Sequence, residues 1–120
     1  MTDTTLYDTV NNLPAFSFIG GTDKILTFNA YEEDGFSPLD LTGATVNWVM
    51  CPYGEYSQKT LEISGDLSTT LTSFTVEIPA EDTLALSGKF IQQVIITDVD
   101  GNIFRPGQGE IIIIPAIPET

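Results

Sequence analysis

The stretch ATVNWVMC, residues 44–51, carries the clearest signal of how the chain folds. Apolar and polar side chains alternate along it, so that Val46, Trp48 and Met50 share one face and Asn47 lies on the other. A period of two residues is typical of a β-strand with one buried face. We therefore expect Trp48 to lie in the core, between two sheets.

The same pattern recurs on both sides of this stretch. The runs that we predict to be strands are KILTFNAY (24–31), ATVNWVMC (44–51), TLEIS (60–64), SFTVEI (73–78), KFIQQVIIT (89–97) and GEIIII (109–114). Segments rich in glycine, proline and aspartate separate them about every 8 to 12 residues, which predicts an all-β sandwich. The runs 89–97 and 109–114 are more continuously apolar. They fit either central strands covered on both faces or a strand that pairs with another subunit.

One segment, IPAEDTLALSG (78–88), has a different pattern. Pro79 stands near its start, Glu81 and Asp82 follow, and Gly88 closes it. This order is typical of one or two helical turns, and such a segment would carry the chain from one sheet to the other.

The charge balance excludes several classes of partner. Of the 120 residues, 17 are acidic and 4 are basic, which gives a net charge of −13. A chain with so few cations has no basic surface for phosphate groups, so we expect neither nucleic acid nor an anionic membrane as a partner. The acidic surface would suit a basic partner, although a solvated surface explains it equally well. The first residues lack the features of a signal peptide, and no apolar run approaches the roughly 20 residues that span a bilayer.

Catalytic chemistry has few candidates. The chain has no histidine, which excludes the Ser-His-Asp triad, the Cys-His dyad and histidine metal ligands. The acids at 32–34 (Glu32, Glu33 and Asp34) fall in a predicted turn, and Glu81 and Asp82 fall at a helix start, where acids have structural reasons to be. Cys51 ends an apolar strand and is interpreted as a packed thiol. We expect no enzymatic activity, no cofactor and no metal ion.

The stretch IITDVDGNIF, residues 95–104, fits two structures. Asp98, Asp100 and Asn102 have the alternate spacing of a calcium loop, but glycine and glutamate are missing from the places where an EF-hand needs them. A hairpin needs only Asp100 and Gly101 between two strands, both with positive φ. We predict the hairpin, with Asp98 facing solvent beside it, and keep a weak surface calcium site as the alternative.

The order of several short motifs resembles small immunoglobulin-like (Ig-like) domains of tailed-phage structural proteins, including the N-terminal domains of upper baseplate proteins. PLDLTGATVNWVM (38–50) is similar to the family's opening, and AEDTLALSGKFIQQVIITDVDGNIFRPGQGEIIIIP (80–115) to its second half. The resemblance covers roughly residues 24–115. The matching positions are Leu41, Thr42, Gly43, Leu86, Gly88, Phe90, Asp98, Asp100, Gly101, Gly109, Ile111 and Ile113.

The resemblance implies an Ig-like antiparallel β-sandwich of about seven strands with one short helical turn. It also implies a non-enzymatic virion protein that is made in the host cytoplasm, is oligomeric in the particle, and contacts capsid, baseplate or fibre subunits. Baseplate relatives continue beyond this domain, whereas the sequence ends at Thr120. We therefore expect a stand-alone component, such as a capsid decoration protein or a small tail, baseplate or fibre-anchoring protein.

The ends of the chain and one loop supply the expected contacts. Residues 1–13 are polar and are expected to form an arm outside the core, before a domain at 14–115 and a tail at 116–120. The residues expected to contact partners are Leu6, Tyr7 and Val10 in the arm, and Tyr53 and Tyr56 in the turn CPYGEYSQ (51–58). The alternative function is a carbohydrate- or cell-surface-binding module, because exposed tyrosines can stack on sugars.

Overall fold

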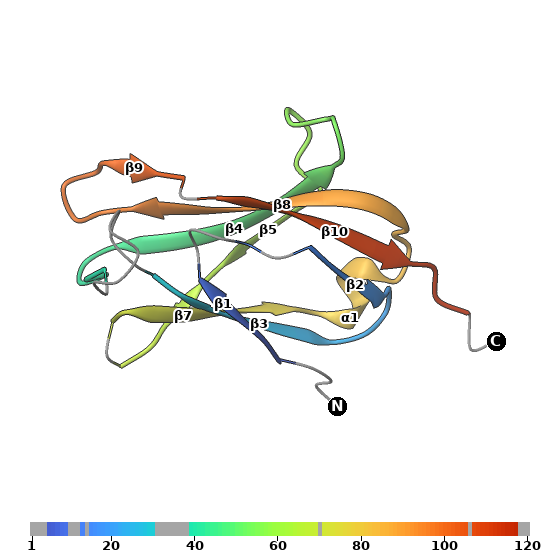
Figure 1. Ribbon diagram of the computed structural model, residues 1–120, viewed down its shortest axis with the longest axis horizontal. Coiled ribbons are helices and arrows are strands. Elements are labelled where there is room, and N and C mark those ends of the chain that lie inside the picture. Colours follow the sequence, from blue (N-terminus) through green and yellow to red (C-terminus); the bar gives the residue numbers. More distant parts are fainter. Residues whose placement is uncertain are drawn as a thin grey trace.

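The computed structural model describes residues 13, 15–30, 39–69, 71–105 and 107–117, together with the backbone of residues 5–9. These residues form two sheets that face each other (Figure 1). The four-stranded sheet has the order β1 (Thr5–Thr9), β3 (Lys24–Asn29), β7 (Ser73–Ile78) and β6 (Asp66–Leu67). The six-stranded sheet has the order β2 (Phe16–Ile19), β10 (Gln108–Ile114), β8 (Gly88–Thr97), β4 (Thr45–Pro52) and β5 (Leu61–Ser64), and β9 (Ile103–Phe104) pairs with β8.

The predicted all-β sandwich is confirmed. Each of the six predicted strands is present, with ends within two residues of the expected ones. The predicted helical turn is α1 (Ala80–Thr83), which carries the chain from β7 in one sheet to β8 in the other. Asp23 accepts a hydrogen bond from the backbone N–H of Ala80 at 2.8 Å, and so satisfies one of the free donors at the start of this helix.

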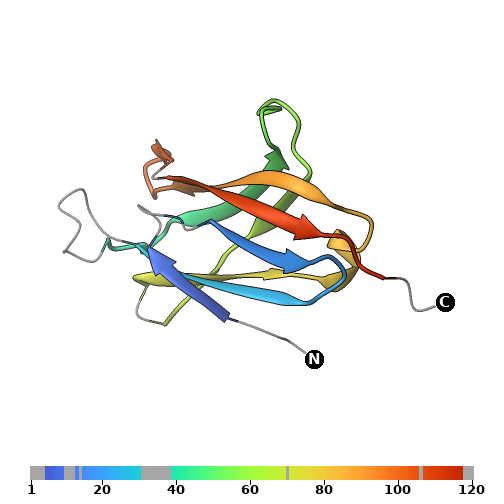
Figure 2. The same cartoon turned by 45° about the vertical axis from the view of Figure 1, so that its right-hand side comes forward.

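The sandwich is not wholly antiparallel, which corrects the expected topology. β1 pairs with β3, and β10 with β2, in parallel register. Figure 2 shows the reason: the chain reverses direction between β1 and β2 and again between β2 and β3, and it changes sheets each time. Two reversals leave β1 and β3 pointing the same way in the same sheet. Alternation within single strands carries no information on such crossings.

The expectation that residues 1–13 lie outside the core is wrong for Leu13. This side chain is only 7% exposed and belongs to the hydrophobic core. Residues 5–9 lie beside β3 as an edge strand of the same chain. Backbone hydrogen bonds can add a segment to a sheet edge whatever its side-chain pattern. For this reason the side-chain pattern of residues 5–9 did not predict β1.

The core is built from the inward rows of the central strands. Val46, Trp48 and Met50 of β4 are buried, as predicted, and Trp48 is 0% exposed. The indole Nε1 of Trp48 donates a hydrogen bond of 2.8 Å to Oε1 of Gln92 on β8, whose side chain is also fully buried. In the β4–β8 register Trp48 lies opposite Val94, two residues from Gln92, so the hydrogen bond joins neighbouring strands.

The two continuously apolar runs are interior strands of the six-stranded sheet, and this chain covers their outer face only in part: Ile91 of β8 is 8% exposed, whereas the outward isoleucines of β10 are exposed. In β10, Ile111 and Ile113 are buried in the core, whereas Ile112 and Ile114 are 46% and 45% exposed. The run of isoleucines is therefore two-sided: one row fills the core and the other lies on the surface.

We predict that Gln92→Leu destabilises the fold by about 1–3 kcal/mol, because it leaves the buried indole N–H of Trp48 without its acceptor. Trp48→Ala should cost more, about 3–5 kcal/mol, because it empties the centre of the core. Urea unfolding followed by circular dichroism measures both. The double variant Trp48→Phe, Gln92→Leu removes donor and acceptor together. If the double variant lost as much stability as Trp48→Phe and Gln92→Leu together, the loss of this hydrogen bond would not explain the effect of Gln92→Leu.

Candidate interaction surface

The outer face of the six-stranded sheet is formed by the residues that alternate with the core rows. On β4 these residues include Val49 and Cys51, and on β8 they include Ile91, Gln93 and Ile95. The register places Val49 opposite Gln93 and Cys51 opposite Ile91. Because side chains in a strand alternate between faces, the burial of Trp48 and Val94 inward fixes this second set outward.

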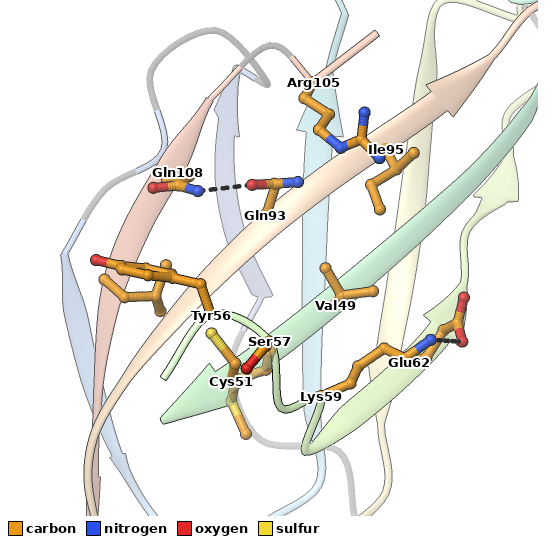
Figure 3. A pocket seen from close by; sticks show the side chains of 12 residues that line it. Val49, Cys51, Tyr56, Ser57, Lys59, Glu62, Gln93, Ile95, Arg105 and Gln108 are labelled. Carbon is orange, nitrogen blue, oxygen red and sulfur yellow. Dashed lines mark hydrogen bonds and ion pairs between the residues drawn. The ribbon is translucent and has the colours of Figure 1, made fainter. Parts of the chain in front are cut away.

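These outward residues form the floor of a groove of about 310 Å³. Its floor is mostly apolar, with Val49, Cys51, Ile91 and Ile95. Figure 3 shows Tyr56 and Ser57 of the β4–β5 loop on one side and Arg105, which follows β9, at the opposite end. The groove is therefore bounded by two connections that lie about 50 residues apart in the chain.

Successive turns hold the β4–β5 loop in place. Within it, the N–H of Glu55 donates to the carbonyl of Pro52 at 2.9 Å, and that of Gln58 to the carbonyl of Glu55 at 3.0 Å. Tyr53 donates its backbone N–H to the carbonyl of Lys89 at 3.0 Å. Lys89 Nζ lies 4.7 Å from the centre of the Tyr53 ring, a distance suited to a cation–π interaction. Tyr56 is 62% exposed, so its ring is accessible to a partner.

The β8–β9 hairpin is confirmed, but its turn differs from the predicted one. The N–H of Gly101 donates to the carbonyl of Asp98 at 3.0 Å, and that of Asp98 to the carbonyl of Asn102 at 2.9 Å. Gly101 has φ of +88°, and among the described residues Leu71 is the one non-glycine with positive φ. Asp100 therefore does not share the left-handed conformation. The loop is a three-residue hairpin with a bulged glycine rather than a two-residue turn.

Asp98 organises this turn instead of simply facing solvent. Its carboxylate accepts the backbone N–H groups of Asn102 at 2.8 Å and Asp100 at 3.0 Å, and the side-chain amide of Asn102 at 3.2 Å. These bonds, the Asn102 backbone N–H foremost, lower the pKa of Asp98 below the usual 3.8. The ionised carboxylate therefore stabilises the turn at neutral pH, and this stabilisation is lost as the pH falls through the lowered pKa of the folded chain.

The turn does not favour the calcium alternative, because N–H donors of the turn itself already bind both carboxylate oxygens of Asp98. Within the part of the chain that the structure describes, no three acidic or cysteine side chains gather in a way that could hold a metal ion. The absence of an essential metal remains a prediction.

A second turn, at residues 40–43, packs against this hairpin. Asp40 accepts the hydroxyl of Thr42 at 2.6 Å and its backbone N–H at 2.9 Å, and these bonds, the hydroxyl foremost, lower the pKa of Asp40. Gly43 has φ of +74°, and a Cβ there would lie 3.0 Å from the side chain of Val99. The turn at Gly43 and the hairpin at Val99, which are far apart in the sequence, therefore meet at one end of the six-stranded sheet.

Two ion pairs and one amide pair cross the outer face. Lys59 lies 2.7 Å from Glu62, and Lys89 lies 3.5 Å from Glu110. The Nε2 of Gln108 donates to the Oε1 of Gln93 at 2.6 Å, across the β10–β8 register. Exposed pairs of this kind contribute little stability, so the polar groups around the groove stay available to a partner.

Cys51 lies in the groove floor, so the thiol interpreted from the sequence as packed lies on the outer side of the sheet and not in the core. Its side chain is half-buried and faces outward, on the opposite side of β4 from Met50. Burial, and secondarily the negative charge of Glu55, raise the pKa of Cys51 above 9.0. The thiol is therefore protonated at neutral pH and has no feature of an activated nucleophile.

The predicted contact residues fall on different parts of the molecule. Tyr56 lines the groove on the outer face of the six-stranded sheet, and Tyr53 lies at the end of this face, beside Lys89. Leu6 and Tyr7 lie in β1, where the backbone is described, and Val10 lies outside the described residues. Of the acids weighed as catalytic, Glu81 and Asp82 are exposed on α1. The others (Glu32, Glu33 and Asp34) also lie outside the described residues.

Sequence reasoning missed the residues that surround the two tyrosines, namely Lys59, Gln93, Arg105 and Gln108. Gln93 could have been found, since it alternates with Gln92 in a strand whose other face is core. Arg105 gave no local signal, because its place beside Ile95 depends on how the hairpin folds back.

Comparison with known proteins gives a structural relative but no sequence relative. No protein-family model matches the chain, and no curated protein matches it significantly. Among solved structures, the fold is similar to the N-terminal domain of phage TP901-1 ORF48, with a TM-score of 0.59 and 9% sequence identity. The match covers 94% of this chain and 98% of that one. At this identity the likeness concerns the fold alone. In the described part of the chain, none of the helical structure has the length and apolar character to cross a membrane.

We predict that Gly101→Val lowers stability by roughly 1–3 kcal/mol, because a β-branched residue resists the positive φ at this position. Gly101→Asn is the matched control, since asparagine tolerates the left-handed region and should cost much less. Chemical denaturation of both variants measures the difference. Equal losses in the two variants would contradict the assigned turn.

We predict that Cys51 reacts slowly with iodoacetamide at neutral pH, and that the midpoint of its rate against pH is higher in the folded chain than in the unfolded one, because burial raises its pKa. Glu55→Gln should move the midpoint down slightly, because it removes the smaller cause of the shift. The rate is measured against pH by mass spectrometry, with the urea-unfolded chain as reference. A native midpoint at or below that of the unfolded chain would contradict the prediction.

Proposed function

We propose that the chain is a non-enzymatic structural component of a tailed-phage particle that acts through protein–protein contacts. The observation that carries the proposal is the fold similarity to a phage protein domain over 94% of the chain. The chemistry of the sequence agrees with it. Histidine is absent, and the pKa of Cys51, the single cysteine, is raised, whereas an activated thiol would have a lowered one.

An Ig-like sandwich is the finer fold assignment that we propose. The Ig layout places strands A, B, E and D in one sheet and C, F and G in the other. The antiparallel order β3-β7-β6 corresponds to strands B, E and D and β4-β8-β10 to C, F and G, while the parallel strands β1 and β2 and the strand β5 are added at the edges. Modules of this architecture serve as docking units on many surfaces, which suits a capsid decoration protein or a small tail, baseplate or fibre-anchoring component in the virion.

The contacts themselves are assigned to two places. The outer face of the six-stranded sheet presents Tyr53 and Tyr56 beside the groove. The edge strand β1 contains Leu6 and Tyr7 and is followed by Val10, and a sheet edge can pair with a partner's strand. In the particle, contacts with capsid, baseplate or fibre subunits would use one or both places.

A carbohydrate-binding module is the second candidate, and one observation favours it. The exposed ring of Tyr56 lies on a groove that also presents the amides of Gln93 and Gln108. An aromatic ring beside amides suits the stacking and hydrogen bonding of a sugar. The apolar floor of Val49, Ile91 and Ile95 suits a protein partner better.

We predict that purified virions contain this protein at a fixed copy number relative to the major capsid protein, measured by quantitative mass spectrometry. Detection in the lysate but never in purified particles would overturn the proposal. A glycan array with the wild-type chain and a Tyr53→Ala, Tyr56→Ala variant separates the second candidate, which requires glycan binding that the double variant loses.

A further inference from the structure

All the exposed cationic side chains of this acidic chain lie on one face. The chain has four basic residues against 17 acidic ones. Lys24 is buried, with its Nζ 5.8 Å from the centre of the Phe18 ring. The other three, Lys59, Lys89 and Arg105, are exposed around the outer face of the six-stranded sheet. Acidic residues lie on this face too, since Glu62 lines the groove and Glu110 lies beside Lys89, so what matters is which cation is left without a carboxylate.

The three cations differ in whether a carboxylate lies beside them. Lys59 has Glu62 as its partner and Lys89 has Glu110. Among the described residues, no carboxylate forms an ion pair with Arg105, which lines the groove beside Ile95 (Figure 3). A guanidinium presents a fork of donors that matches a carboxylate, and such charge-assisted bonds are among the stronger ones in proteins.

The floor of the groove suits apolar groups, in contrast to Arg105. Val49, Ile91 and Ile95 form apolar surface between Arg105 and Lys59, and Tyr56 forms one side. The strands beneath are already paired on both sides, since β8 lies between β10 and β4. A ligand in the groove is therefore recognised through its side chains and not as an added strand.

We propose that this groove binds an acidic segment of a partner protein, with aliphatic side chains on the floor and a carboxylate on Arg105. The proposal deepens the proposed function by giving the chemistry of the partner. It also differs from the partner expected from composition: the net charge of −13 suits a basic protein, whereas Arg105 in the groove suits a carboxylate.

The test uses the isolated chain and a library of random twelve-residue peptides displayed on a carrier phage. Peptides retained by the wild-type chain are expected to be enriched in aspartate or glutamate next to aliphatic residues. Synthetic copies of them should bind Arg105→Gln about tenfold more weakly or worse, because a hydrogen-bonded charge pair is lost. Thr69→Glu is the matched control. It changes the net charge by the same amount in an exposed turn next to β6 of the other sheet, and should bind as the wild type does.

Cys51 reports where the peptide binds, since its thiol lies in the groove floor. Bound peptide should slow the alkylation of Cys51 at a fixed high pH, and Ile95→Asp, which puts a negative charge on the floor, should abolish both binding and protection. Thermal melting of each variant checks that it is folded.

Several results would overturn the proposal: no enrichment, enriched peptides without acids, equal binding by Arg105→Gln, or unprotected Cys51. Sedimentation that showed the chain self-associating, with Arg105→Gln restoring the monomer, would assign the face to a second copy instead. These failures leave membership of the particle untouched, because that is decided by mass spectrometry of virions.

Discussion

The hydrogen bond from the indole of Trp48 to Gln92 fixes how the central strands of the larger sheet align, and most other features follow from that alignment. It joins the neighbouring strands β4 and β8 in a region from which water is excluded. An unsatisfied indole N–H or amide there would cost more than most single contacts gain. The β4–β8 register is therefore strongly specified, since a slip of one residue would turn Trp48 to the surface and separate the two groups.

The character of the outer face follows from that register. Once Val46, Trp48 and Met50 point inward, Val49 and Cys51 must point outward. The same strand pair thus makes the core on one side and the groove floor on the other. The proposed recognition surface therefore lies on strands whose register the core fixes.

Loops give this face its edges and its charge. The β4–β5 loop supplies Tyr56 and Lys59, and the hairpin after β8 supplies Arg105. Hydrogen bonds to Asp98 shape that hairpin, and the turn at Gly43 packs against it. A scaffold fixed by its core and edged by short, well-bonded loops is a common way to combine stability with recognition.

Local sequence patterns were sufficient to predict the fold class, six strands, the helical turn and the burial of Trp48, because alternation and turn residues act over a few positions. They could not predict the parallel pairing of β1 with β3 and of β2 with β10, the core position of Leu13, or the acceptor of the Trp48 indole. Nor could they show that Lys59, Lys89 and Arg105 share one face, since these residues lie on separate strands and loops. All of these features arise from contacts between segments that are distant in the chain and that meet only when the two sheets pack together.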